Sequence, residues 1–119
     1  GLEEKADYYL TKSLGIDLYD EGGGCQDGAH LAADGMSWSA VVSGICGCGL
    51  NGDILSVCPK LPANWEKVAF TLQWKGRIIQ IVIGEGRVTL HLKRGPALPV
   101  VLMGETVTLV EGERVCASC

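Results

Sequence analysis

The stretch KVAFTLQWKGRIIQIVIGEGRVTLHL, residues 67–92, decides the fold of the second half of the chain. Apolar residues alternate with other residues in three consecutive runs, and this period of two is typical of half-buried strands. The apolar positions are Val68, Phe70, Leu72 and Trp74, then Ile79, Ile81 and Ile83, then Val88, Leu90 and Leu92. The pairs Lys75-Gly76 and Glu85-Gly86 separate the runs at hairpin spacing. The stretch therefore predicts three strands joined by tight turns, with the apolar positions, Trp74 included, facing a core.

Shorter runs on both sides extend this pattern. Residues 54–57 are apolar, and residues 59–62 (PKLP) form an extended connection. Residues 100–103 and 106–110 flank a further turn at Gly104-Glu105. Pro96 and Pro99 suit an edge strand or a crossover. The sequence predicts about six strands in a small antiparallel β-sandwich or half-sandwich.

The first fifty residues follow a helical pattern. Residues 2–14 predict an amphipathic helix ended by Gly15. Its apolar face would carry Leu2, Ala6, Tyr9 and Leu10. Residues 31–50 predict a second helix that is apolar almost all round, as in a helix buried on every side. Since a chain of 119 residues offers too little to bury it, we expect this helix to sit inside a larger helical assembly.

Composition narrows the classes of function. The net charge is −4 with both signs interleaved, so no basic face is available for nucleic acid. No apolar run reaches the ~18 residues needed to cross a membrane, and the N-terminal residues lack the order of a secretion signal. These features exclude nucleic acid and membrane as expected partners.

Six cysteines invite a disulfide or a metal interpretation. Cys46 and Cys48 lie in the second predicted helix, where free cysteine behaves as a small buried hydrophobe. Cys116 and Cys119 form a C-x-x-C without an element after it to frame a redox site, and the spacings do not fit a zinc knuckle. We therefore expect reduced, structural cysteines, no metal, and a reducing, cytoplasmic compartment.

Residues 22–30, GGGCQDGAH, form a loop that ends where the second helix starts and that contains several glycines, a carboxylate and an imidazole. Backbone N–H groups at a helix N-terminus together with the imidazole of His30 make an anion site plausible. Asp27 could cap that helix or fix the tautomer of His30. The alternative is that Asp27 is only a cap and His30 only a hydrogen-bonded, partly buried histidine, and the residues alone leave both open.

The predicted sheet offers two further candidates. His91 alternates outward on its strand, which predicts a solvated surface residue. Trp65 follows the loop at residues 61–64, outside the core alternation. Because a flat aromatic face suits a pyranose ring, Trp65 stays open as a sugar contact.

Two motifs in order carry a family resemblance. Residues 27–38, DGAHLAADGMSW, resemble the D-G-x-H-x-A-x-x-G-x-[ST]-W segment of glycoside hydrolase family 65. Residues 55–65, LSVCPKLPANW, are similar to the entry of that family into its C-terminal sandwich, and residues 70–76 are similar to the first hairpin there. The resemblance runs from about residue 5 to residue 110. The family includes phosphorylases of maltose, trehalose, kojibiose and nigerose, with some hydrolases.

The resemblance implies an α+β fragment. Residues 1–50 would be the last helices of a catalytic (α/α)6 barrel with a phosphate-site loop, and residues 51–119 a C-terminal β-sandwich domain. In the family's inverting phosphorylases, phosphate attacks the anomeric carbon of an α-linked glucose disaccharide and yields β-glucose 1-phosphate. A glutamate protonates the leaving sugar oxygen, and no position here matches its motif. We therefore expect no catalytic residue in this chain, and no activity from the chain alone.

His30 matches the histidine that contacts phosphate in the family's phosphorylases, and Asp27 would orient its ring. Inorganic phosphate would be a co-substrate, and no cofactor is implied. The expected partners are an α-glucoside disaccharide, phosphate and the rest of the enzyme chain, with a homodimer left open. Two alternatives remain: a hydrolase of the same family, and a non-catalytic module in which the sandwich binds glycans through Trp65 or stabilises the barrel.

Overall fold

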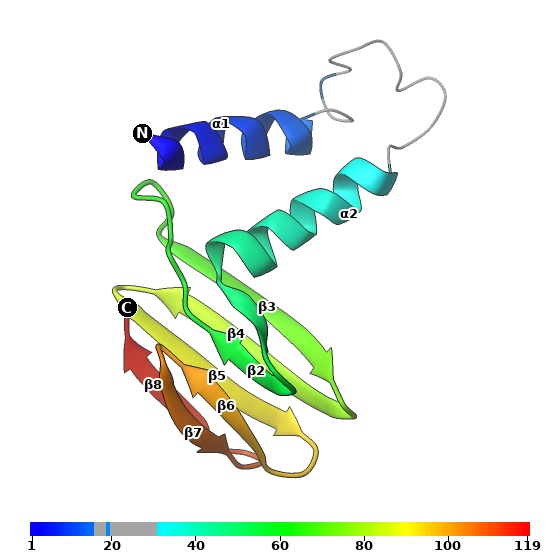
Figure 1. Cartoon of the computed structure of the whole chain (residues 1–119), viewed down its shortest axis with the longest axis vertical. Coiled ribbons are helices and arrows are strands. Elements are labelled where there is room, and N and C mark those ends of the chain that lie inside the picture. The colour runs from blue at the N-terminus through cyan, green and yellow to red at the C-terminus, as the bar shows by residue number, and fades with distance from the viewer. Residues whose placement is uncertain (16–18, 20–30) are drawn as a thin grey trace. The chain divides into compact units, whose positions relative to one another are not determined.

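A computed structural model describes residues 1–15, 19 and 31–119. The described residues fall into two compact units, residues 1–44 and residues 45–119, here called the helical unit and the sheet unit. Figure 1 shows the elements of both.

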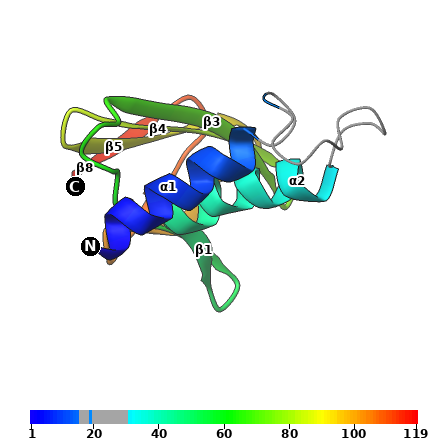
Figure 2. The same ribbon diagram turned by 90° about the horizontal axis from the view of Figure 1, so that it is seen from above.

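The helical unit consists of two helices that pack side by side (Figure 2). Helix α1 is Leu2–Gly15, and α2 is Leu31–Ser39, continued by a π-helical segment, Ala40–Ile45. The hydroxyl oxygens of Ser13 and Ser37 lie 2.7 Å apart and join the two helices by a hydrogen bond. The prediction of a first helix over residues 2–14 is confirmed.

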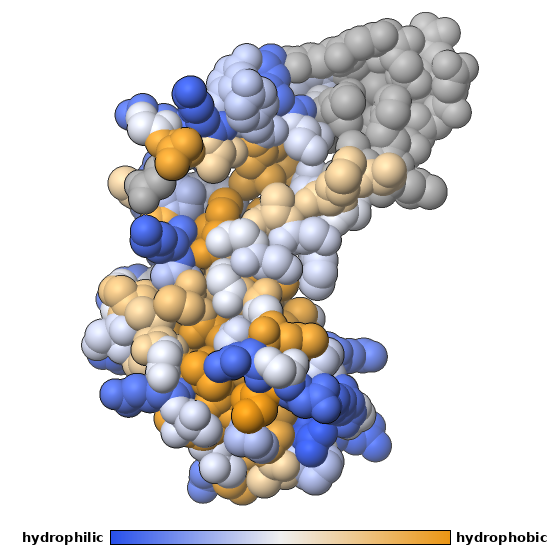
Figure 3. All heavy atoms as spheres, in the orientation of Figure 1, coloured by the Kyte–Doolittle hydropathy of each residue, from blue (hydrophilic) through white to orange (hydrophobic). Residues whose placement is uncertain are grey.

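The helical unit leaves much of its apolar surface uncovered. On the predicted apolar face of α1, Leu10 is buried, whereas Leu2, Ala6 and Tyr9 are exposed. Other large apolar side chains are exposed as well: Tyr8, Leu14, Met36 and Trp38. Figure 3 shows apolar side chains at the surface of this unit among charged ones. The described chain therefore leaves these apolar side chains of both helices exposed.

The second helix is shorter than predicted. Helical structure ends at Ile45, and Cys48–Asn51 forms strand β1, so the prediction of a helix through residue 50 is wrong there. Gly47 provides the physical reason. Its φ is +59°, and a Cβ at this position would lie 2.0 Å from the carbonyl oxygen of Cys58. The chain turns at Gly47 against the backbone of Cys58, whose N–H donates to the Gly47 carbonyl at 3.2 Å.

The sheet unit is built from two four-stranded sheets. The first sheet, in the order β1-β2-β6-β7, contains β1, β2 (Ile54–Val57), β6 (Leu98–Leu102) and β7 (Glu105–Leu109). The second sheet, in the order β3-β4-β5-β8, contains β3 (Lys67–Trp74), β4 (Arg77–Gly84), β5 (Arg87–Arg94) and β8 (Arg114–Ser118). Neighbouring strands are antiparallel except β2 and β6, which run parallel.

The core lies between the inner faces of the two sheets. The second sheet contributes six side chains that are 0% exposed: Ile79, Ile81, Ile83, Val88, Leu90 and Leu92. The first sheet contributes Leu55, Val57, Leu98, Val100, Leu102 and Leu109, all buried. The predicted inward positions of β4 and β5 are therefore confirmed. Those of β3, including Trp74, are only half-buried, because β3 is the edge strand of its sheet.

The predicted turns at Lys75-Gly76 and Glu85-Gly86 are confirmed. All four residues have positive φ, between 45° and 75°, as in the two-residue hairpin turns whose twist matches that of the strands. The sandwich prediction needs two corrections within the described residues, one to the number of strands and one to the direction of a strand pair. Eight strands replace about six, since β1 was assigned to a helix and β8 was not predicted. One strand pair, β2 with β6, is parallel rather than antiparallel.

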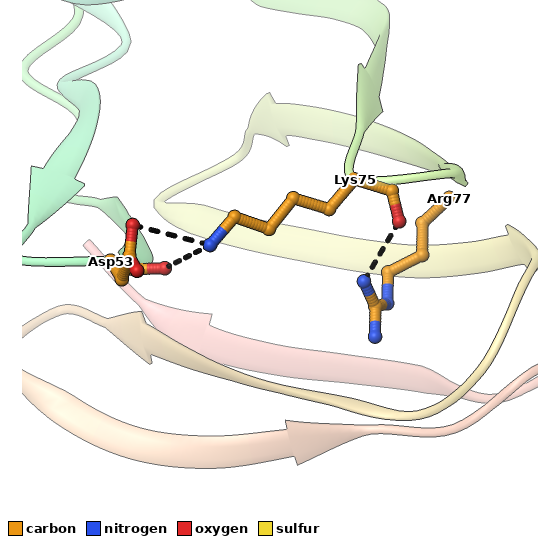
Figure 4. A network of polar contacts seen from close by, with 3 residues as sticks. All are labelled: Asp53, Lys75 and Arg77. Carbon is orange, nitrogen blue, oxygen red and sulfur yellow. Dashed lines mark hydrogen bonds and ion pairs between the residues drawn. The ribbon is translucent and has the colours of Figure 1, made fainter.

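Two basic side chains tie turns of the sheet unit together (Figure 4). Lys75 Nζ lies 3.2 Å from Oδ1 of Asp53 and 3.4 Å from its carbonyl oxygen, which links the β3–β4 turn to the β1–β2 turn. The guanidinium of Arg77 donates to the carbonyl oxygens of Lys75 (2.9 Å), Pro96 (2.8 Å) and Ala97 (3.4 Å). Since residues 95–97 connect β5 in one sheet to β6 in the other, Arg77 fixes the crossover between the sheets. Pro96 thus lies in a crossover, as predicted, whereas Pro99 lies in β6, an inner strand of the first sheet, so the prediction for Pro99 is wrong.

Candidate functional site

The predicted phosphate site lies outside the described residues. Asp27 and His30, with the whole loop of residues 20–30, fall in the part of the chain that the structure does not describe. The roles of His30 and Asp27 therefore stay predictions.

Trp65 stands beside a hollow on the surface of the sheet unit. Its backbone N–H donates to the carbonyl oxygen of Pro62 at 2.9 Å, which closes a turn in the connection between β2 and β3. The side chain is half-buried and lines two adjoining depressions, of about 760 and 350 Å³. The larger one is here called the Trp65 depression. The sequence prediction singled out Trp65, and the structure shows that it borders a concave surface.

The Trp65 depression lies on the outer face of the second sheet. Since Ile81, Ile83, Val88 and Leu90 point into the core, the residues that alternate with them point outward. The depression is lined by Trp65, Glu66, Lys67, Val82, Gly84, Glu85, Arg87 and Thr89. Its charged members are two carboxylates and two cations, so their formal charges cancel.

Gly84 forms part of the floor that the two depressions share. It is opposite Lys67 on β3 and Arg87 on β5. A Cβ at Gly84 would lie 2.9 Å from the carbonyl oxygen of Glu66, so a side chain would collide with the backbone that leads into β3. The absence of a side chain keeps this floor low between two long basic residues. The sequence gives Gly84 as one glycine of a hairpin, and only the crossing backbone reveals this second role.

A smaller pocket of about 260 Å³ lies on the same face and is lined by Gln80, Val82, Thr89, His91 and Arg114. Gln80, His91 and Arg114 form one cross-strand row on β4, β5 and β8. Val82 and Thr89 line the Trp65 depression as well, so the two hollows adjoin. The outer face therefore presents a continuous, mainly polar surface from Trp65 to Arg114.

His91 faces outward as predicted, but it is not fully solvated. It is half-buried, and its Nδ1 atom is shielded from solvent and has no hydrogen-bond partner among the described residues. Burial lowers the pKa of His91, the positive charges of Lys93 and Arg114 lower it further, and the backbone of Gly112 opposes these effects. The environment thus favours the neutral imidazole.

The cysteines divide by burial. Cys46 and Cys48 are buried, and burial raises the pKa of Cys46 to about 11 and, together with the neighbouring Cys46, that of Cys48 to about 12. Cys58, Cys116 and Cys119 are exposed, and all five described cysteines are free. Cys116 Sγ lies 3.3 Å from Oγ1 of Thr89. The thiols of Cys46 and Cys48 are accordingly held in the unreactive, protonated form.

Two classes of site have no candidate in the described part of the chain. Residues 1–15, 19 and 31–119 contain no group of three or more His, Cys, Asp or Glu side chains placed to hold a metal ion. Over the same residues, no helix has the length and apolarity needed to span a bilayer.

Comparison with known proteins identifies the sheet unit. The model of the glycosyl hydrolase family 65 C-terminal domain matches residues 50–109. A trehalose phosphorylase of Geobacillus stearothermophilus is 30% identical over 110 residues, covering 92% of this chain and 14% of that protein. A maltose phosphorylase of Bacillus subtilis is 31% identical over 110 residues, covering 87% of this chain and 14% of that protein. A kojibiose phosphorylase of Halothermothrix orenii is 36% identical over 87 residues, covering 73% of this chain and 11% of that protein.

A solved structure supports the fold. It is described as a kojibiose phosphorylase from the human microbiome, and it matches 98% of this chain and 16% of its own with a TM-score of 0.85 at 23% identity. At that identity the match speaks for the fold alone. The chain spans about one seventh of the curated relatives, and the matched model covers half of it. The chain belongs to glycoside hydrolase family 65, and its sheet unit carries the C-terminal domain of that family.

Proposed function

We propose that this chain is the C-terminal portion of an inverting α-glucoside phosphorylase. The complete enzyme would cleave an α-linked glucose disaccharide with inorganic phosphate and release β-glucose 1-phosphate. The observation that carries the proposal is the extent of the matches. The trehalose and maltose phosphorylases align with 92% and 87% of the chain, well beyond the C-terminal domain model at residues 50–109.

The helical unit would form the last helices of the catalytic barrel. Support comes from its exposed apolar side chains, such as Tyr9, Met36 and Trp38, which are 68%, 66% and 55% exposed in this chain. Apolar surface of this kind is stabilised when a neighbouring element covers it. The relatives are about seven times longer than the chain, so the general acid would come from the rest of the enzyme.

His30 would act on the phosphate. An imidazole beside the incoming phosphate would orient the nucleophile and offset its repulsion from the site. Asp27 would hold the ring in the tautomer that presents a donor to phosphate. Neither residue breaks or forms a bond to the sugar, so the chain contributes positioning rather than acid–base chemistry. A cytoplasmic location and the absence of a cofactor belong to the same proposal.

The test uses a longer polypeptide that carries this chain at its C-terminal end. Purified protein is incubated with maltose, trehalose, kojibiose or nigerose in the presence and absence of phosphate, and products are followed by ¹H and ³¹P NMR. We expect β-glucose 1-phosphate from one of the four disaccharides, and no turnover by the 119-residue chain alone. Phosphate-independent release of glucose would instead identify a hydrolase of the family. Turnover by the isolated chain would contradict the proposal.

A matched pair of variants tests the role of His30. His30→Gln removes the imidazole, and a lost donor to an oxyanion costs roughly 10²–10³-fold in rate. We expect a fall of that order in kcat/KM for phosphate. His91→Gln, which changes a histidine on the second sheet, serves as the control. Equal kcat/KM for phosphate in the two variants would remove His30 from the site.

A further inference from the structure

We propose that the Trp65 depression is a binding site for a neutral oligosaccharide, with a pyranose ring stacked on the indole of Trp65. The site belongs to the C-terminal domain and needs no catalytic step. It therefore goes beyond the proposed phosphorolysis and does not depend on it.

The aromatic wall is the first argument. Trp65 is half-buried, so part of its indole packs against the protein while part faces the hollow. The turn closed by the carbonyl oxygen of Pro62 holds the backbone of Trp65 in place. One face of a pyranose ring presents C–H bonds, which pack well on a flat, electron-rich ring. The half-buried indole, on a backbone anchored by this turn, thus offers a stacking surface to a sugar ring.

The charged rim is the second argument. Glu66, Glu85, Lys67 and Arg87 line the depression, and within the described residues none of these side chains has an ion pair or a hydrogen bond. Carboxylates accept hydrogen bonds, whereas ammonium and guanidinium groups donate them. A sugar hydroxyl can donate to the carboxylates and accept from the cations. Because the two negative and two positive charges cancel, the rim attracts neither an anion nor a cation strongly. A neutral, polyhydroxylated ligand fits this set best.

The dimensions favour more than one sugar ring. The depression of about 760 Å³ lies within the ~300–1,000 Å³ range of small-molecule sites. A second hollow of about 350 Å³ adjoins it, and both are lined by Trp65, Glu66, Gly84 and Glu85. Gly84 keeps the shared floor low, since the nearby Glu66 backbone leaves no room for a side chain. Two connected hollows around one aromatic ring suit adjacent units of an oligosaccharide.

The experiment is an NMR titration of the ¹⁵N-labelled 119-residue chain with maltotriose. The chain has three tryptophans, so three indole N–H signals report on three separate places. We expect the signal of Trp65 and the amide signals of Gly84 and Arg87 to shift with saturation, whereas those of Trp38 and Trp74 stay in place. Inorganic phosphate at the same concentration should leave the Trp65 signal unchanged.

Variants separate stacking from hydrogen bonding. Trp65→Ala should weaken maltotriose binding about tenfold, the loss expected for an aromatic contact, while Trp65→Phe should retain part of the affinity. Arg87→Gln keeps the ring and removes a cation from the rim, and it should weaken binding severalfold even if Trp65→Ala fails to fold. Trp38→Phe, at an exposed tryptophan of the helical unit, is the matched control and should bind as the parent chain does.

Three results would overturn the proposal. They are an unmoved Trp65 signal at tens of millimolar maltotriose, a shift caused by phosphate but not by the sugar, and equal affinities of the parent chain, Trp65→Ala and Arg87→Gln. Because binding is measured without turnover, a negative result here leaves the phosphorolysis assay unaffected. Failure of that assay would likewise leave this titration valid.

Discussion

Replacing Arg77 should destabilise the sheet unit through the crossover between the sheets. Arg77→Met keeps an unbranched apolar stem and removes all three donors to the carbonyl oxygens of Lys75, Pro96 and Ala97. Two of these hydrogen bonds, at 2.8 and 2.9 Å, have ordinary lengths, and the third, at 3.4 Å, is long. With a net contribution of about 0.5–1.5 kcal/mol for each good bond, the loss is about 1–3 kcal/mol.

Arg77→Lys should fall between the parent chain and Arg77→Met. The guanidinium of Arg77 holds its donors in a fixed planar arrangement and reaches the carbonyl oxygens of Lys75 on the β3–β4 turn and Pro96 on the crossover at the same time. A single ammonium group cannot reach both carbonyl oxygens. We therefore expect the lysine variant to recover at most one of the two good bonds.

The assay is urea unfolding followed by NMR signals of amides in β4 and β5, which isolates the sheet unit from the helical unit. Arg94→Met is the control, since Arg94 is an exposed arginine on β5 without a side-chain hydrogen bond or ion pair among the described residues. If the free energy of unfolding changed equally, within about 0.5 kcal/mol, in Arg77→Met and Arg94→Met, the crossover would not depend on the guanidinium.

Three further predictions follow from burial. Ile81→Ala empties a position that is 0% exposed between the sheets, so it should lower the free energy of unfolding by about 2–5 kcal/mol in the same urea assay, and a loss below about 1 kcal/mol would contradict the packing described. His91 has a pKa lowered from 6.5, so the folded state resists its protonation; its contribution to stability is present above pH 6.5 and is lost as the pH falls through the lowered pKa. His91→Gln should therefore flatten the acid side of a plot of Tm against pH, and an unchanged slope would argue against the shielded imidazole. Cys46 and Cys48, with raised pKa values, should react with iodoacetamide at pH 8 far more slowly than the exposed Cys116, as peptide mass spectrometry can measure; equal labelling in the native chain would refute their burial.

The strands at residues 67–92 were predictable because two local signals agree there. The period of two places Ile81 and Leu90 inward, and the turns at Lys75 and Glu85 set the register by their length. Strand β1 was not predictable in the same way. Its residues, CGLN, have no strong periodicity, and the turn at Gly47 depends on the backbone of Cys58, which belongs to a separate segment.

The site was only partly accessible from the sequence. Trp65 stands outside the core alternation, which marked it as a candidate. The hollow beside it depends on the Glu66 backbone crossing Gly84, a contact that no local pattern encodes. The lowered pKa of His91 depends in part on the positive charge of Arg114, which lies in strand β8, a strand that the sequence did not predict. The hollow beside Trp65 and the environment of His91 both depend on residues that lie far apart in the chain, so local sequence patterns could not predict them.

The parallel pairing of β2 with β6 has a consequence for synthesis of the protein. Leu55 leaves the ribosome before Val100, its partner in the sheet. The edge of β2 that pairs with β6 therefore stays unpaired while the hairpins from β3 to β5 form locally. During that interval the open edge of β2 can pair with another nascent chain. A stop codon placed after β5 would make this waiting state permanent, and we expect such a product to require chaperones or to enter inclusion bodies.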